Sequence, residues 1–107
     1  MPELSEQDFR LQADRALEGA LRSLLPLADE GGFEVELQNG VLQIVFEDPA
    51  AAKFVVSPNA PVRQVWVSAM SRSYKLTWSG ASASFELNGE PLDALLARLV
   101  HQFLASV

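Results

Sequence analysis

The sequence predicts an α+β sandwich of two layers, in which two helices pack on one face of a mostly antiparallel sheet of about six strands. Three observations lead to this fold. Apolar residues follow a helical period near each end of the chain, they follow a period of two through the middle, and turn residues separate the middle segments at short intervals. Strands joined by short turns pair antiparallel, and each helix has only one apolar side. Both helices should therefore cover the same sheet face and leave the other open to solvent.

The length and composition set the limits of this prediction. The 107 residues allow a single domain over 1–107, and 49% hydrophobic residues are enough for a packed core. No apolar run approaches the roughly 20 residues that cross a bilayer, and the N-terminus has no basic-then-apolar signal pattern. We therefore expect a soluble, cytoplasmic protein. The chain has no cysteine, which excludes disulfides, thiolate chemistry and cysteine-ligated metal clusters.

The first predicted helix begins after Ser5, whose hydroxyl can accept from the free N–H groups of the first turn. Asp8 stands three residues later, as in a weaker form of the capping box. Because Pro26 has no N–H to donate, the regular helix should end near Leu25. Residues at three- and four-residue steps form its apolar stripe: Phe9, Ala13, Ala16, Leu17, Ala20, Leu21 and Leu24.

After Gly31-Gly32 the apolar period changes to two, which predicts a strand over 33–38 with carboxylates on its polar face. Asn39-Gly40 is a strong hairpin signal, because both residues tolerate a positive φ. The returning strand is predicted over 41–47, and a third strand over 53–57. The expected inward residues of these three strands are Phe33, Val35, Leu37, Leu42, Ile44, Phe46, Phe54 and Val56.

Three further strands are predicted over 62–69, 74–78 and 83–88. Trp78 lies on the apolar face of its strand, so we expect it in the core. Pro91 suits the first turn of the second helix, where a backbone donor would be unpaired anyway. The apolar face of this helix consists of Leu92, Leu95, Leu96, Leu99, Val100 and Phe103.

Trp66 is the most informative residue of the fourth predicted strand. Val65, Val67 and Ala69 form the aliphatic side, and if that side faces the core, Trp66 is presented to water beside Gln64. An exposed tryptophan on an open sheet is typical of a protein-contact hot spot. A slip of one residue in the strand register would bury the ring instead, so both interpretations stay open.

The distribution of charge restricts the kinds of partner. The net charge is −6, with 11 acids and 3 bases in residues 1–48 and 3 acids and 5 bases in residues 49–107. An acidic half argues against nucleic acid, whose phosphates require a basic footprint. Cations or a basic protein surface are better candidates. The plainer alternative is that these acids form a solvated face.

Catalytic groups are scarce. The single histidine, His101, is displaced from the apolar stripe of the second helix and should face solvent. No serine lies in a nucleophile-elbow motif, and no glycine-rich phosphate loop is present. We therefore expect a protein that is not an enzyme.

Carboxylates near the first strand indicate a possible metal site. Asp29 and Glu30 follow the first predicted helix, and Glu34 and Glu36 share one face of the strand. Hard cations such as calcium, manganese or ferrous iron accept carboxylate oxygens. The spacing matches neither an EF-hand nor a His–carboxylate triad, so an acidic, solubilising edge is the other interpretation that stays open.

Several segments resemble the frataxin family. The run Pro61-Val62-Arg63-Gln64-Val65-Trp66-Val67, followed by Tyr74 and Trp78-Ser79-Gly80, is similar to the signature strands of that family. Further similarity lies in Phe9 with Ala13-Asp14, in Leu27-Ala28-Asp29, in Gly40-Val41-Leu42, and in Gly89-Glu90 leading into Leu92 and Leu95-Leu96. The resemblance covers nearly the whole chain in the correct order. Its implied fold is the helix–meander–helix sandwich predicted above.

The resemblance implies a small monomeric protein that binds iron weakly and regulates iron–sulfur cluster assembly. Its implied partners are the cysteine desulfurase and the iron–sulfur scaffold protein, without nucleic acid or membrane. An acidic ridge on the first helix and first strand would hold iron and contact the partner, and the open sheet face would add contacts. The implied ridge positions are Asp14, Asp29, Glu30, Glu34 and Glu36, and the implied sheet contacts are Asn59, Gln64 and Trp66.

Two other functions remain as alternatives. An iron-oxidising or iron-storing protein would need clustered carboxylates that hold two metals. This ridge has fewer acids than the family usually carries, because Leu25-Pro26 and Gly31-Gly32 stand at positions that are often acidic. The third possibility is a protein-interaction module that has kept the fold and lost iron binding.

Overall fold

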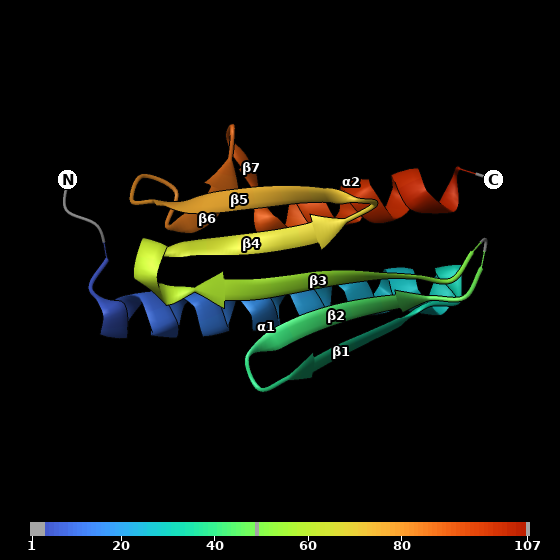
Figure 1. Cartoon of the computed structure of the whole chain (residues 1–107), viewed down its shortest axis with the longest axis horizontal. Coiled ribbons are helices and arrows are strands. Elements are labelled where there is room, and N and C mark those ends of the chain that lie inside the picture. The colour runs from blue at the N-terminus through green and yellow to red at the C-terminus, as the bar shows by residue number, and fades with distance from the viewer. Residues whose placement is uncertain (1–3, 49, 107) are drawn as a thin grey trace.

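The computed structural model describes residues 4–48 and 50–106, which form two helices, a short 3₁₀ turn and a seven-stranded antiparallel sheet (Figure 1). The strands lie in the sheet in the order of the chain, from β1 to β7. The elements are α1 (Glu6–Gly31), β1 (Glu34–Gln38), β2 (Val41–Phe46), β3 (Ala52–Asn59), η1 (Ala60–Val62), β4 (Gln64–Ala69), β5 (Arg72–Ser79), β6 (Ser84–Leu87), β7 (Glu90–Pro91) and α2 (Leu92–Leu104).

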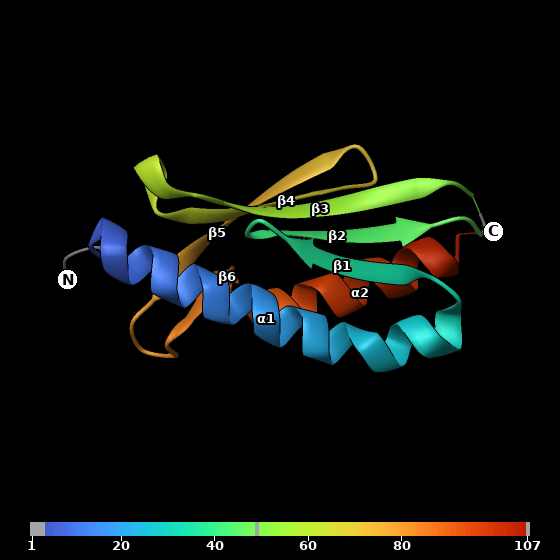
Figure 2. The same cartoon turned by 90° about the horizontal axis from the view of Figure 1, so that it is seen from below.

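The two helices lie side by side on one face of the sheet, as predicted (Figure 2). The other face carries no helix in the described part of the chain. Neither helix of the described residues is long and apolar enough to cross a membrane.

The core lies between the helices and the sheet, and aromatic rings fill its centre. Phe46 of β2 packs against Phe33, Phe54 and Phe103, with ring centroids 5.0, 5.0 and 4.5 Å away. The alternation predicted for β2 and the stripe predicted for α2 are both confirmed. The fully buried large side chains are Phe9, Phe46, Phe54, Phe85, Leu17, Leu24, Leu42, Ile44, Leu76, Leu95, Leu96 and Leu99.

The predicted end of the first helix is wrong. Helix α1 continues through Pro26 to Gly31, and Gly32 caps it at φ 71° with its N–H bonded to the carbonyl of Ala28 at 2.9 Å. Leu24 and Ala28, on either side of the proline, are both buried. Pro26 has no N–H, so the helix loses one backbone hydrogen bond there. Because the proline ring is exposed, Leu24 and Ala28 still keep their places in the core.

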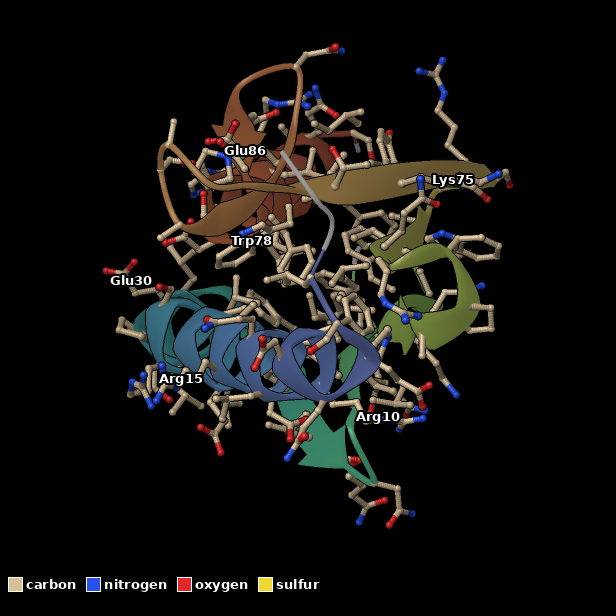
Figure 3. The ribbon with its side chains drawn as sticks, turned by 90° about the vertical axis from the view of Figure 1, so that its left-hand side faces the viewer. Arg10, Arg15, Glu30, Lys75, Trp78 and Glu86 are labelled. Atoms are coloured by element: carbon tan, nitrogen blue, oxygen red, sulfur yellow. The ribbon has the colours of Figure 1, made fainter. Side chains whose placement is uncertain are left out.

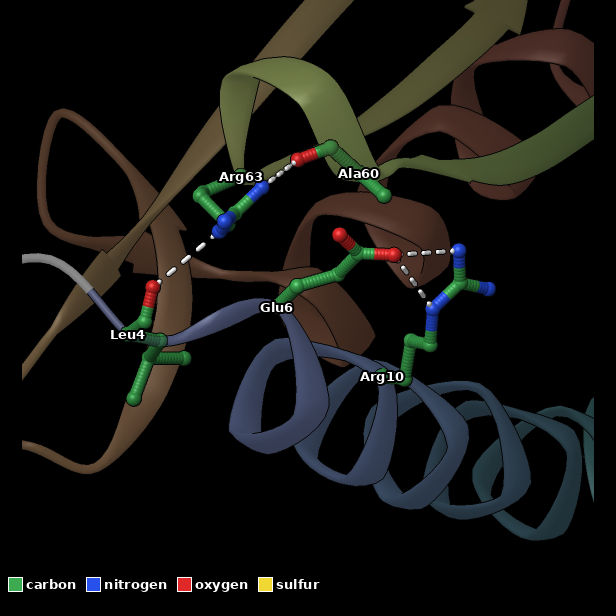
Figure 4. A network of polar contacts seen from close by, with 5 residues as sticks. All are labelled: Leu4, Glu6, Arg10, Ala60 and Arg63. Carbon is green, nitrogen blue, oxygen red and sulfur yellow. Dashed lines mark hydrogen bonds and ion pairs between the residues drawn. The ribbon is translucent and has the colours of Figure 1, made fainter.

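The start of α1 is fixed by a cap and by a contact with η1. The Ser5 hydroxyl accepts from the N–H of Asp8 at 3.1 Å, which confirms the predicted cap. Arg63, at φ 53°, donates through Nε to the carbonyl of Leu4 at 3.1 Å and through Nη1 to the carbonyl of Ala60 (Figure 4). This single side chain ties the segment before α1 to the turn between β3 and β4.

The sheet has one more strand than predicted. Glu90 and Pro91, expected before and inside the second helix, form β7 and pair with β6. Pro91 is therefore the N-cap of α2 rather than a residue of its first turn. Trp78 also departs from the expectation, because it packs against the core and against Phe85 at 5.2 Å but is only partly buried.

Candidate functional site

The outer face of the sheet carries the tryptophan that the sequence analysis singled out. In β4, Val65 and Val67 are buried, at 0% and 1% exposure, so Gln64 and Trp66 belong to the side away from the helices. The register that presents Trp66 on the open face is therefore confirmed. The ring is partly buried rather than freely exposed.

Two neighbours hold the Trp66 ring in place. Its Nε1–H donates to Oε1 of Gln64 at 2.8 Å. Nζ of Lys75 lies over the ring, 4.9 Å from the centroid, within the range of a cation–π contact. An aromatic ring that is fixed before binding loses little freedom when a partner covers it.

Lys75 was missed by the sequence analysis. It is the cross-strand partner of Trp66 in the β4–β5 pair, and Ser57 is the partner on the other side. The length of the turn between β4 and β5 sets this pairing, so the register of that hairpin is the signal that could have identified Lys75. Asn59 is the cross-strand partner of Gln64, which brings all three predicted sheet contacts into adjacent strand positions.

The predicted ridge acids are all exposed but do not form a cluster. On α1, Asp14 and Asp29 are 15 residues apart, which is about 22 Å along a helix axis. Asp29 and Glu30 belong to the last turn of α1, not to the loop after it. Figure 3 shows the Glu30 side chain on the side of α1 away from β1.

The β1 acids lie on the other side of their strand. Val35 and Leu37 pack against the core, so Glu34 and Glu36 point to the outer sheet face. Strand β1 runs along the C-terminal part of α1 at the free edge of the sheet (Figure 2). The predicted acids other than Glu30 therefore line both sides of one long edge.

Glu18 is an acidic residue of this edge that the sequence analysis did not include. It lines a hollow of about 200 Å³ with Asp14, next to Leu37 and Gly40 at the β1–β2 turn. The spacing of four residues between Asp14 and Glu18 is the signal that places both on one side of a helix.

The structure limits the kind of metal site that these acids can make. Carboxylate oxygens suit a hard cation, but in residues 4–48 and 50–106 no three potential metal ligands lie close enough to share one ion. The described residues therefore do not provide an enclosed iron centre. His101 is exposed on α2, as predicted.

The carboxyl groups with lowered pKa values are those of Glu6 and Glu90, which lie outside the open sheet face of Trp66 and outside the set of predicted acids. Arg10 donates to Glu6 at 2.9 Å and lowers the pKa of that carboxyl. Arg98 donates to Glu90 at 2.9 Å, lowers the pKa of the glutamate, and has its own pKa raised in return. Each is an exposed ion pair at a helix, with the geometry of a structural contact.

The chain is similar to known proteins over nearly its whole length. Residues 2–106 match the model of the frataxin-like domain. The iron–sulfur cluster assembly protein CyaY of Cupriavidus metallidurans is 29% identical over 104 residues, which cover 95% of this chain and 92% of the relative. The protein of the same name from Janthinobacterium sp. is 31% identical over 99 residues, covering 91% and 88%.

The fold agrees with a solved structure as well. Frataxin from Psychromonas ingrahamii superposes with a TM-score of 0.68 at 14% identity, over 94% of this chain and 91% of that protein. At this identity the superposition bears on the fold alone, and it confirms the predicted α+β sandwich. Together with the match to the domain model, these similarities show that the chain belongs to the frataxin (CyaY) family.

Proposed function

We propose that this protein regulates iron–sulfur cluster assembly by docking on the cysteine desulfurase and its scaffold protein. Its relatives are named for iron–sulfur cluster assembly. The observation that carries the docking proposal is the position of Trp66, which is held by Gln64 and Lys75 on an open sheet face.

The two surfaces have different tasks in this proposal. Among the described residues, the acidic edge of α1 and β1 holds no group of three potential metal ligands, but it extends over more than one helix turn. Such a spread of charge suits a broad basic surface better than a single ion. Such an edge steers the encounter with a basic groove of the desulfurase. Trp66 then contributes the short-range contact that fixes the complex, because a fixed aromatic ring is a typical hot spot.

Iron has a secondary place in this proposal. Asp14, Asp29, Glu30, Glu34 and Glu36 would attract ferrous or ferric ions along the edge, with few carboxylates on any one ion. Weak, shallow binding of this kind agrees with a regulator that senses or carries iron. It gives little support to iron oxidation or storage, which requires carboxylates clustered around two metals.

Binding of the purified protein to the cysteine desulfurase of its host, measured over a salt series, tests the proposal. We expect the affinity to fall steeply as salt increases, and Trp66→Ala to weaken binding by on the order of 2 kcal/mol. Val62→Ala is the matched control, since Val62 is an exposed apolar residue in η1, outside the sheet face. It should leave the affinity unchanged.

Charge variants separate the edge from the tryptophan. Glu34→Gln with Glu36→Gln should lower the association rate and its salt dependence. Glu90→Gln with Asp93→Asn removes the same charge on the helix side of the sheet, where Glu90 pairs with Arg98 of α2, and should do neither. No binding by the wild-type protein would contradict the proposal and leave an interaction module with another partner. Binding that persists at high salt would keep the partner but remove the acidic edge from its recognition.

A further inference from the structure

A groove opens between α1, the β5–β6 end of the sheet and the start of α2. Its volume is about 610 Å³, within the range of small-molecule sites. Apolar groups predominate in its lining, with Ala16, Ala20 and Phe85 among them. It is on the helix side of the sheet and is therefore separate from the outer face that carries Trp66.

Two arginines stand on one wall of this groove. Arg15 and Arg22 come from α1, seven residues apart, which is about 10 Å along the helix axis. The ion pairs among the described residues are Glu6–Arg10 and Glu90–Arg98, so neither arginine of the groove has a carboxylate within 4.0 Å there. Two positive charges thus stand at the outer rim of one groove, in a chain whose net charge is −6.

Gly19 leaves the space between the two arginines open. It lies four residues after Arg15 and three before Arg22, which places it on the same side of α1. A Cβ atom built on Gly19 would lie 4.0 Å from Nη2 of Arg22, with no nearer neighbour. The Arg22 guanidinium therefore extends over the glycine, where both arginines can reach a common ligand.

Trp78 provides a flat apolar wall. Figure 3 shows it between α1 and β6, with Arg15 on the outward side of the helix. The indole packs edge-on against the buried Phe85 ring at 5.2 Å and 67°, which fixes its orientation. A planar ring inserted into the groove could stack on or pack against this indole.

We propose that this groove binds a small organic phosphate that carries a flat ring. The phosphate lies at the rim over Gly19, between Arg15 and Arg22, and the ring packs on Trp78. Phosphate fits better than carboxylate, because its charge of nearly −2 and its several oxygens can accept from two guanidinium groups at once.

Asp93 fixes the direction of the ligand. It stands on the α2 side of the groove, where its Oδ1 accepts from the N–H of Ala94 at 2.9 Å. Its negative charge repels a phosphate from the start of α2 and leaves the α1 side as the place for it. Removing this charge should therefore strengthen binding, opposite to the effect of removing an arginine.

Titration of the protein with adenosine 5′-monophosphate, followed by the ¹H–¹⁵N signals of the two indoles and of the arginine Nε groups, tests this site. We expect the signals of Trp78, Arg15 and Arg22 to move while that of Trp66 stays. Arg15→Gln with Arg22→Gln should weaken binding about tenfold or more, and the matching double change to Lys should weaken it less. Asp93→Asn should tighten it.

Controls distinguish this site from general attraction of anions. Arg72→Gln removes an exposed charge of β5 outside the groove and should leave the affinity unchanged. Gly19→Met keeps both arginines but fills the space between them, and should abolish binding in a folded protein. Binding of adenosine as strong as that of the monophosphate would overturn the phosphate position. Absence of any movement at Trp78, or equal losses in Arg72→Gln and the double variant, would overturn the site.

Discussion

The indole N–H of Trp66 donates to Oε1 of Gln64 at 2.8 Å, two residues away on the same face of β4. The hydrogen bond satisfies the indole nitrogen of a partly buried ring and fixes the orientation of the ring on the sheet face. Trp66 and Gln64 therefore act as one unit on the open sheet face.

Gln64→Leu should release the Trp66 indole without unfolding the protein. We expect the Nε1–H signal of Trp66 to shift and to exchange faster with water, and the free energy of unfolding to fall by about 0.5–1 kcal/mol. Asn59→Leu, at the cross-strand position, should leave the indole signal in place, since no hydrogen bond joins Asn59 to the ring. An unchanged signal in Gln64→Leu would contradict the contact.

Pro26→Ala should stabilise the protein. Alanine would restore the N–H that can donate to the carbonyl of Arg22, in a helix that already continues to Gly31. Because Pro26 is exposed, no packing is lost, and we expect a gain of about 1–3 kcal/mol in the free energy of unfolding. Ser23→Ala is the control for a change in helix propensity alone, and should contribute no more than about 0.5 kcal/mol. A loss of stability in Pro26→Ala would mean that the proline has a packing or folding role.

Two glycines of α1 should respond to alanine in opposite directions. At Gly19 the added Cβ meets only Arg22 Nη2, at 4.0 Å, so Gly19→Ala should stabilise the helix by about 0.5–1 kcal/mol. At Gly31 it would lie 2.9 Å from Cε2 of Phe33 and 3.1 Å from Cδ1 of Leu104. Gly31→Ala should therefore destabilise the protein by about 1–3 kcal/mol, as measured by chemical denaturation. Equal effects at both positions would contradict the close packing at Gly31.

The stability of the protein should decrease in acid, partly through Glu6 and Glu90. Arg10 and Arg98 lower the pKa of these carboxyls below the usual 4.5 in the folded state. A depressed pKa adds stability above pH 4.5, and this contribution disappears as the pH falls through the folded-state value. Glu6→Gln and Glu90→Gln should each reduce the acid dependence of the unfolding free energy slightly, because both pairs are exposed. Glu47→Gln is the control, since Glu47 is exposed after β2 and belongs to neither ion pair.

The sequence predicted the elements whose local pattern agrees with their place in the fold. Strand β2 and helix α2 are examples, because every apolar position of their periods is buried. Helix α1 was predicted too short, since the rule for Pro26 is local while the burial of Leu24 and Ala28 depends on the whole core. Strand β7 is only two residues long and has no periodicity to detect.

The candidate site was predicted less completely than the fold. Trp66 and Gln64 could be found because alternation along one strand assigns them to the same face. Lys75 could not, since its contact with Trp66 depends on the register between two strands. The predicted acids all belong to the acidic half of the chain, but they do not gather at one point. Asp14 and Asp29, for example, lie 15 residues apart along α1.

The order of the sheet has a consequence for the synthesis of this protein. Each strand pairs with the strand made just before it, so the meander can grow as the chain leaves the ribosome. Helix α2 is made after all seven strands, yet it covers Phe46 and Phe54 through Phe103. The growing chain must therefore keep Phe46 and Phe54 partly uncovered until α2 has been made, and a chain that stops before α2 would present these rings to chaperones and proteases.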